Sequence, residues 1–246
     1  MTVQAGTERV ATAPLELLGR DRDLAELFAL VDGIEERGGA LVVRGEAGIG
    51  KSALLAAAQE RALERGVAVV STVGALSEAQ LAFAGLHQLL LPSLGHLDLL
   101  PDPQRQALET AFGIAEGDAP DLFLVGLATL GLVAERSTET PLLFVLDDAQ
   151  WLDQPSCEVL AFVARRVESD PAVLLFGVRE GLPRPFDEAD LAELSLTGLD
   201  QEASSALLDA GATTLPVELR RRILEEAAGN PLALIELPAA AADLGA

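Results

Sequence analysis

The sequence is poor in several features that would assign it to other classes of protein. It has one cysteine, Cys157, which cannot form an internal disulfide bond. No apolar run approaches the roughly 18 residues of a membrane-spanning helix, and the first 13 residues lack the apolar core of a signal peptide. These absences predict a cytoplasmic protein that does not bind a membrane.

Basic residues are also scarce. Lysine and arginine together number 17, against 39 acidic residues, and the net charge is −22. Because phosphate contacts need clustered basic side chains, this balance argues against direct binding of nucleic acid by this segment. Half of the 246 residues are hydrophobic, which excludes a disordered chain. The length predicts one large domain or two modest ones, at roughly 100–200 residues each.

Lysine is the rarest of the charged residue types. Lys51 is the only lysine, against 16 arginines. A lysine ammonium is a compact point charge, whereas the arginine guanidinium is a wide planar fork. The position that keeps lysine in this chain is therefore expected to need the compact cation.

Lys51 lies in a glycine-rich pattern, Gly45-x4-Gly50-Lys51-Ser52. A buried strand is predicted at 40–43 and a helix from near Lys51 to Arg65, which gives the strand–loop–helix context of a phosphate-binding loop. Its backbone N–H groups and the helix N-terminus would face phosphate oxygens. Lys51 would reach the β- and γ-phosphates, and the Ser52 hydroxyl would bind Mg²⁺. The predicted nucleotide-binding residues of the loop are Gly45, Glu46, Ala47, Gly48, Ile49, Gly50, Lys51, Ser52 and Ala53.

Two acids follow a second buried strand, predicted at 142–146. Asp147 is the natural carboxylate on the magnesium side of such a site. Successive strand residues point to opposite faces, so Asp148 is expected to have a different role, which is to hold the attacking water. The alternative is a turn that begins with two aspartates and caps the next helix, although Asp153 or Ser156 is the better cap for a helix from Pro155.

A third apolar run, 172–178, ends in Arg179. The carboxyl ends of parallel strands share one edge of a sheet, so Arg179 is expected near the phosphate loop. There it could sense the γ-phosphate or stabilise transition-state charge. The alternative is a solvated arginine paired with Glu180.

Three segments together resemble a known family: the phosphate loop, Asp147-Asp148-Ala-Gln-Trp-Leu-Asp153, and Leu17-Leu-Gly-Arg-Asp21. They are similar to the AAA-type, signal-transducing (STAND) P-loop ATPase module of large, MalT-like transcription regulators of the LuxR family. The resemblance runs from about Leu17 to Leu237. It implies an ATP/ADP switch with slow hydrolysis.

The resemblance also implies roles for residues outside the phosphate loop. Leu18, Gly19 and Arg20 would lie beside the nucleotide base, although Asp21 stands where the family usually has glutamate. Arg179 matches the sensor arginine of the family. Gly229-Asn230-Pro231 matches the lid motif, which would place Pro231 against the nucleotide.

The same three lid residues suit a tight corner between two helices. Gly229 can take a left-handed conformation after a helix that ends near Ala228, Asn230 can cap the next helix, and Pro231 suits its first position. The simpler interpretation of the motif stops at this corner.

The alternation of strands and helices predicts an α/β fold of the P-loop NTPase type. We expect a three-layer sandwich with a parallel sheet of about five strands, followed by a small helical lid. The expected organisation is a disordered leader at 1–13, an ATPase core at 14–198 and a lid at 199–246. Within the core, residues 78–136 form a helical insertion with helices predicted near 78–91, 103–116 and 120–136.

ATP is favoured over GTP because the guanine-recognition motif Asn-Lys-x-Asp needs a second lysine. The expected cofactors are ATP or ADP with Mg²⁺. Full-length regulators of the family continue into sensor and DNA-binding regions, so the chain is expected to be a fragment of such a regulator or a stand-alone ATPase module. Self-association or contact with regulatory domains would then provide its partners. The alternative function is a stand-alone P-loop ATPase or a small-molecule kinase.

Overall fold

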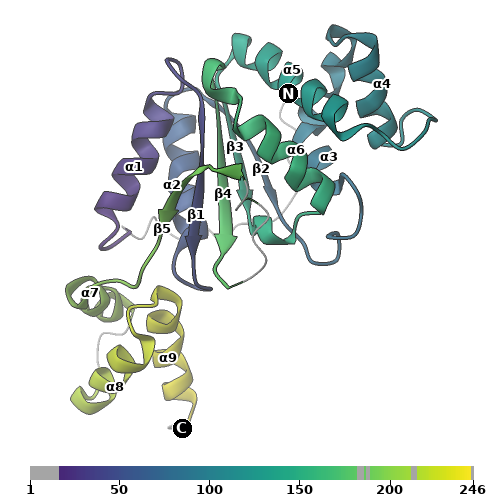
Figure 1. The fold of residues 1–246 in the computed structure, drawn as a ribbon. Coiled ribbons are helices and arrows are strands. Elements are labelled where there is room, and N and C mark those ends of the chain that lie inside the picture. The colour runs from purple at the N-terminus through teal and green to yellow at the C-terminus, as the bar shows by residue number, and fades with distance from the viewer. Residues whose placement is uncertain (1–16, 182–185, 187–188, 212–214, 245–246) are drawn as a thin grey trace.

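A computed structural model describes residues 17–181, 186, 189–211 and 215–244. The leader expected at 1–13 lies outside these residues. The described chain has a central sheet with helices on both faces and a group of three helices at one end (Figure 1). None of the described helices combines the length and the apolar character needed to cross a bilayer.

The sheet has five strands, all parallel, in the order β2-β3-β4-β1-β5. Their bounds are β1 Gly39–Gly45, β2 Ala68–Val73, β3 Leu142–Asp147, β4 Ala172–Arg179 and β5 Ala192–Ser195. The strands predicted from apolar runs at 40–43, 142–146 and 172–178 are therefore present, as β1, β3 and β4. Since β4 lies between β1 and β3, the carboxyl ends of these three strands form one continuous edge.

Helices cover both faces of the sheet, which is why its strands are almost continuously apolar. Leu41 and Val43 of β1 point into one hydrophobic cluster, and Val42 between them points into another. The first face carries α1 Asp21–Asp32 and α2 Lys51–Glu64; the second carries α3 Ala84–Leu90, α4 Asp102–Ala111, α5 Leu122–Glu139 and α6 Gln154–Ala164 (Figure 1). The predicted three-layer α/β fold of P-loop NTPases is confirmed.

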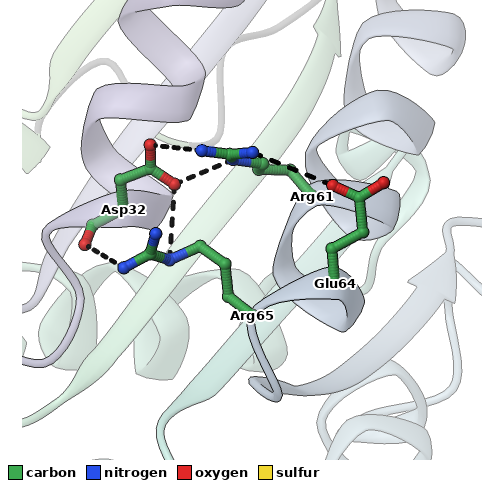
Figure 2. Close-up of polar contacts among 4 residues, drawn as sticks. All are labelled: Asp32, Arg61, Glu64 and Arg65. Carbon is green, nitrogen blue, oxygen red and sulfur yellow. Dashed lines mark hydrogen bonds and ion pairs between the residues drawn. The ribbon is translucent and has the colours of Figure 1, made fainter.

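An ion-pair network joins α1 to α2 (Figure 2). The Arg61 guanidinium donates two hydrogen bonds to the Asp32 carboxylate, each of 2.9 Å, and Arg65 adds an ion pair of 3.4 Å to the same carboxylate. The hydrogen bond from Arg61 is the main reason that the pKa of Asp32 is lowered from its ordinary value. The network holds the end of α2 that is remote from the phosphate loop.

The insertion at 78–136 departs from the sequence prediction at its start. The helix expected over 78–91 is only α3 Ala84–Leu90, and a 3-10 helix follows at Leu91–Leu99. Phe83 has a left-handed φ of 64°, which ends any helix before it. The buried Asp153 carboxylate accepts the N–H groups of Phe83 at 2.8 Å and Gly85 at 3.1 Å, and so holds the chain in this conformation.

The other two insertion helices are present with different ends. The helix expected over 103–116 ends at Ala111, and Gly113 follows with a φ of +67°. The helix expected over 120–136 is α5, whose N-cap is Asp121. Asp153 caps α6 by accepting the N–H of Ser156 at 2.9 Å, which confirms one of the two proposed caps.

The three C-terminal helices are α7 Gln201–Gly211, α8 Val217–Ala227 and α9 Pro231–Leu244. They share a hydrophobic cluster of their own, which consists of Leu199, Ala203, Leu208, Ile223, Ala227 and Leu234. Below, α7, α8 and α9 are called the lid helices. In Figure 1 they lie below the sheet, at the end where the loop after β1 is found.

Candidate functional site

The loop between β1 and α2 has a conformation that needs glycine. Gly48 and Gly50 have φ values of +77° and +107°, where a side chain is strained. A Cβ at Gly45 would lie 2.7 Å from Cγ2 of Ile49 and 3.0 Å from the carbonyl oxygen of Leu196. At each of these positions a larger residue would therefore clash with a neighbour or strain the backbone.

Lys51 begins α2 and is 7% exposed. Its Nζ donates hydrogen bonds to the carbonyl oxygens of Gly45 at 2.9 Å and Glu46 at 2.8 Å, so that two of its three donors bind the loop itself. Burial lowers the pKa of Lys51, while the nearby charges of Asp148 and Asp147 act in the opposite direction. The ammonium thus lies within the electrostatic influence of both predicted carboxylates.

A pocket of about 480 Å³ lies beside this loop. It draws its lining from three parts of the chain: the loop with the start of α2, the segment after β3 together with the end of β4, and the start of α9. The lining residues are Ala47, Gly48, Gly50, Lys51, Ser52, Ala53, Asp148, Gln150, Trp151, Arg179, Pro231, Leu232 and Ile235. Of the other predicted site residues, the lining does not include Leu18, Gly19, Arg20, Gly45, Glu46, Ile49 and Asp147.

Asp147 and Asp148 lie in different environments. The Oδ1 atom of Asp147 accepts the N–H of Asp148 at 2.9 Å and lies against Gly177 of β4, where a Cβ would come within 2.7 Å of it. Asp148 has a left-handed φ of 47°, a conformation that aspartate tolerates better than most residues. This turn takes Asp148 off the strand and into the pocket lining, so the two carboxylates differ in position because of the turn and not because they alternate along a strand; their separate roles stay a prediction.

Gln150 joins Asp148 to the end of β4. Its Nε2 donates to Oδ1 of Asp148 at 2.8 Å, and its Oε1 accepts the backbone N–H of Arg179 at 2.9 Å. Arg179 is paired in register with Gly45 of β1. The structure therefore brings Asp148 and Arg179 to the sheet edge that carries the phosphate loop, and it adds Gln150, to which the sequence analysis gave no role.

The lid helices touch the phosphate loop directly. Asn230 donates from Nδ2 to the carbonyl oxygen of Ala47 at 2.9 Å, and the N–H of Leu232 donates to the carbonyl oxygen of Gly48 at 3.2 Å. A Cβ at Gly48 would lie 2.7 Å from Cβ of Leu232. The start of α9 therefore packs so close to the loop that a side chain at position 48 would clash with it.

The corner before α9 has the geometry that its sequence predicts, with one difference. The Asn230 Oδ1 accepts the N–H groups of Leu232 and Ala233 at 3.1 and 3.3 Å, which makes it the N-cap, and Pro231 is the first residue of α9. Gly229 has the expected left-handed φ, of 80°, but Ala228 before it is left-handed as well, at 46°. The helix therefore ends at Ala227, one residue earlier than expected.

Residues 18–20 lie where the phosphate loop meets the lid helices. Arg20 is 7% exposed, and its Nη2 donates to the carbonyl oxygens of Ile49 at 2.8 Å and Thr197 at 2.9 Å. A Cβ at Gly19 would lie 2.6 Å from that of Ala203 in α7. The segment thus fixes the loop to the chain that leads into the lid helices, and its place beside a nucleotide base stays a prediction.

The donors of the pocket suit a polyphosphate with a bound cation. A Cβ on Gly50 would meet no protein atom within 4 Å, so the loop leaves open space on the side that lines the pocket. Among the described residues there is no group of three or more histidine, cysteine or acidic side chains that could hold a metal by itself. Mg²⁺ in phosphate-binding proteins takes one or two carboxylates and completes its shell with water and phosphate oxygens. The Ser52 hydroxyl and the Asp148 carboxylate line the pocket, and Asp147 lies at the end of β3; these are the residue types that fit that mode of binding.

Comparison with known proteins gives a consistent result. Residues 16–176 match the family model described as the AAA ATPase domain. No curated protein matches the chain significantly.

Solved structures with TM-scores of 0.50 and above share the fold at low sequence identity. The Walker-type ATPase PABY2304 of Pyrococcus abyssi is 18% identical, with a TM-score of 0.50, and the match covers 90% of this chain and 68% of that one. The Drosophila ORC structure bound to DNA contains a chain that is 14% identical, with a TM-score of 0.55, and the match covers 96% and 62%. The STAND protein PH0952 of Pyrococcus horikoshii, which has a tetratricopeptide repeat sensor, is 18% identical, with a TM-score of 0.48 and coverage of 89% and 29%.

Proposed function

The chain belongs to the AAA ATPase domain family, and from that premise we propose that it is a switch that binds ATP or ADP with Mg²⁺ and hydrolyses ATP slowly. We further propose that it serves as the regulatory ATPase module of a transcription regulator of the LuxR family. The observation that carries the switch is the pair of hydrogen bonds from Asn230 and Leu232 to the phosphate loop. A nucleotide-dependent movement of Ala47 or Gly48 would alter these bonds.

The loop binds the phosphates in this proposal. Its backbone N–H groups and the N-terminus of α2 provide partial positive charge at no cost in side-chain entropy. Lys51 exchanges its bonds to the Gly45 and Glu46 carbonyls for bonds to the β- and γ-phosphates. A bound Mg²⁺, held by Ser52 and Asp147, would neutralise phosphate charge.

Asp148 and Arg179 act on the reacting end of the nucleotide. Asp148 accepts a hydrogen bond from the attacking water and orients it toward the γ-phosphorus. Arg179, from the end of β4, stabilises the charge that develops on the γ-phosphate oxygens. Its partner in the β1 register is Gly45, so its backbone is fixed at the mouth of the loop.

Binding is tested first with the nucleotide alone. The purified protein is denatured and the released nucleotide is identified by chromatography, and the stripped protein is then titrated calorimetrically with MgADP and MgATP. Because Trp151 lines the pocket and the chain has no other tryptophan and no tyrosine, its fluorescence provides a second signal.

Lys51→Ala is the decisive variant in this titration. Loss of hydrogen bonds from a charged group costs about 1.5–3 kcal/mol, which corresponds to a roughly 10- to 150-fold loss of affinity. Lys51→Arg should also bind poorly, because the planar fork is wider than the ammonium. Arg37→Ala is the control, because it removes a positive charge from an exposed site outside the pocket. Wild-type affinity in Lys51→Ala would contradict the proposed site.

The switch is tested by the turnover rate and by assembly. Steady-state hydrolysis should be far slower than the ~1–10³ s⁻¹ of most enzymes. Light scattering should show that the mass or shape of the protein differs between MgADP and a non-hydrolysable ATP analogue. Fast turnover together with identical scattering in both nucleotides would favour a metabolic ATPase.

A further inference from the structure

Gln150 occupies an unusual position for a residue without acid–base chemistry of its own. It lies between the carboxylate of Asp148 and the backbone of Arg179, the two groups nearest to the reacting phosphate in the proposed function. Its carboxamide makes one bond to each, of 2.8 and 2.9 Å. It also lines the pocket.

The two bonds fix the orientation of the amide. The carboxylate of Asp148 can only accept, and the N–H of Arg179 can only donate. The amide satisfies both only when its NH₂ group faces Asp148 and its oxygen faces Arg179. The reverse orientation would set an oxygen against a carboxylate and an NH₂ group against an N–H.

The backbone around Gln150 is held on both sides. Ala149 is completely buried in the core, and the N–H of Trp151 donates to the carbonyl oxygen of Asp148 at 2.9 Å. On the other side, a Cβ at Gly74 would lie 2.3 Å from the same carbonyl oxygen, so the chain just after β2 packs closely against this turn. These contacts hold the backbone of Asp148 in place, and the hydrogen bond from Gln150 then directs its carboxylate.

We propose that Gln150 is a positioning residue for ATP hydrolysis, which holds the Asp148 carboxylate in line with the phosphate loop by tying it to the end of β4. This inference rests on the proposed function. In the reaction the water oxygen forms a bond to the γ-phosphorus, and the bond to the β,γ-bridging oxygen breaks, which yields ADP and phosphate. Gln150 fixes one oxygen of Asp148, so that the other can accept the proton that the attacking water loses, and this proton then passes to the phosphate product.

Gln150→Met keeps the length of the side chain and removes both bonds. Misplacement of a catalytic group by about 1 Å can cost roughly 100-fold in rate, so kcat should fall about 10- to 100-fold, while the dissociation constant of MgADP stays within about twofold of wild type. Gln154→Met is the matched control. Gln154 also donates from Nε2 to a carboxylate, that of Glu158 at 2.9 Å, but on the exposed surface of α6, and its loss should leave both values unchanged.

Gln150→Glu gives a readout that a merely structural role would not produce. At neutral pH the introduced carboxylate repels Asp148, and kcat should fall at least as far as in Gln150→Met. The neighbouring charge of Asp148 raises the pKa of the introduced carboxyl group, so as the pH decreases this group becomes protonated and can donate to Asp148 as the amide does. The kcat ratio of Gln150→Glu to wild type should therefore rise at low pH, whereas the ratio for Gln150→Met should stay flat.

Binding of MgADP with aluminium fluoride, which imitates the reacting phosphate, adds a measurement that does not need turnover. Wild type should bind this complex more tightly than MgADP, and Gln150→Met should lose that advantage but keep its affinity for MgADP. Absence of any nucleotide binding by wild type would refute the proposed function itself. Wild type that binds MgADP but gains nothing from aluminium fluoride, or a Gln150→Met that keeps both the gain and wild-type kcat, would overturn the role of Gln150 and leave nucleotide binding intact.

Discussion

Asn230 donates a hydrogen bond to the carbonyl oxygen of Ala47 over 2.9 Å, across 183 positions of the sequence. The same side chain caps α9 through its oxygen. Asn230 therefore both caps the N-terminus of α9 and attaches this helix to the phosphate loop. The consequence is that the two functions of Asn230 can be separated by substitution.

Asn230→Ser should separate them. Serine caps helices about as well as asparagine, but its hydroxyl is too short to reach Ala47. Loss of one neutral hydrogen bond costs about 0.5–1.5 kcal/mol, so ADP should leave roughly 2- to 12-fold faster if the lid retains it. Stopped-flow displacement of a fluorescent ADP analogue measures the rate.

Asp121→Ser is the control for that experiment, because it changes the cap of α5, far along the chain from the lid. It should leave ADP release unchanged. An Asn230→Ser protein that releases ADP at the wild-type rate would show that the bond to Ala47 does not hold the lid against the nucleotide.

Gly48→Ala should prevent the lid from docking. Its Cβ would meet Leu232 at 2.7 Å and Asn230 at 2.9 Å. Gly66→Ala is a close match, since φ is +76° there against +77° at Gly48, and its Cβ would meet nothing within 4 Å. Both variants carry the backbone strain of about 1–2 kcal/mol, but only Gly48→Ala should lose MgADP affinity in calorimetry. Equal affinities in the two variants would mean that lid docking is not required for binding.

The ion pair of Asp32 with Arg61 predicts a pH dependence of stability (Figure 2). The hydrogen bond from Arg61 lowers the pKa of Asp32 below its usual 3.8. A depressed carboxyl pKa stabilises the fold above the unfolded value, and this stabilisation is lost as the pH falls through the folded one. Asp32→Asn should therefore lower Tm slightly at pH 7, and the difference from wild type should begin to narrow as the pH falls below about 4. A difference that does not narrow at all as the pH falls would mean that packing, not charge, is responsible.

The strands and the phosphate loop could be predicted because their signals are local. Continuous apolar runs mark β3 and β4, and Gly48 and Gly50 mark a loop that needs left-handed φ values. The start of α3 could not be predicted in this way. Residues 78–83 continue a helical pattern, but the carboxylate of Asp153, 70 positions away from Phe83, holds the chain in a left-handed turn. A tertiary contact overrides the local preference there.

The missed site residues also depend on which strands are neighbours. In the sequence, Gly177 is simply a glycine inside an apolar strand. In the structure β3 lies beside β4, and the Asp147 carboxylate occupies the place where a side chain at position 177 would be. Gln150 was part of the segment that carries the family resemblance, but its role requires the end of β4 within reach of its amide. The spacing of residues along the sequence does not reveal that Asp147 lies against Gly177 or that Gln150 reaches Arg179.

Gly177→Ala tests the proposed role of Asp147 without changing its charge. The new Cβ would lie 2.7 Å from Oδ1 of Asp147 and 2.8 Å from Cδ1 of Leu55, so the carboxylate must move. If Asp147 helps to hold Mg²⁺, its displacement should weaken ADP binding in the presence of Mg²⁺ by roughly 10- to 150-fold, the equivalent of one charged hydrogen bond. Binding of ADP in EDTA should not change, and Asp147→Asn should reproduce the pattern.

Gly39→Ala in β1 is the control, because its Cβ would meet only the end of the Leu30 side chain, at 3.1 Å. The measurement is a calorimetric titration of all four proteins with and without Mg²⁺. Equal weakening of Gly177→Ala under both conditions would indicate general damage to the sheet edge, and it would remove the support for a magnesium-binding Asp147.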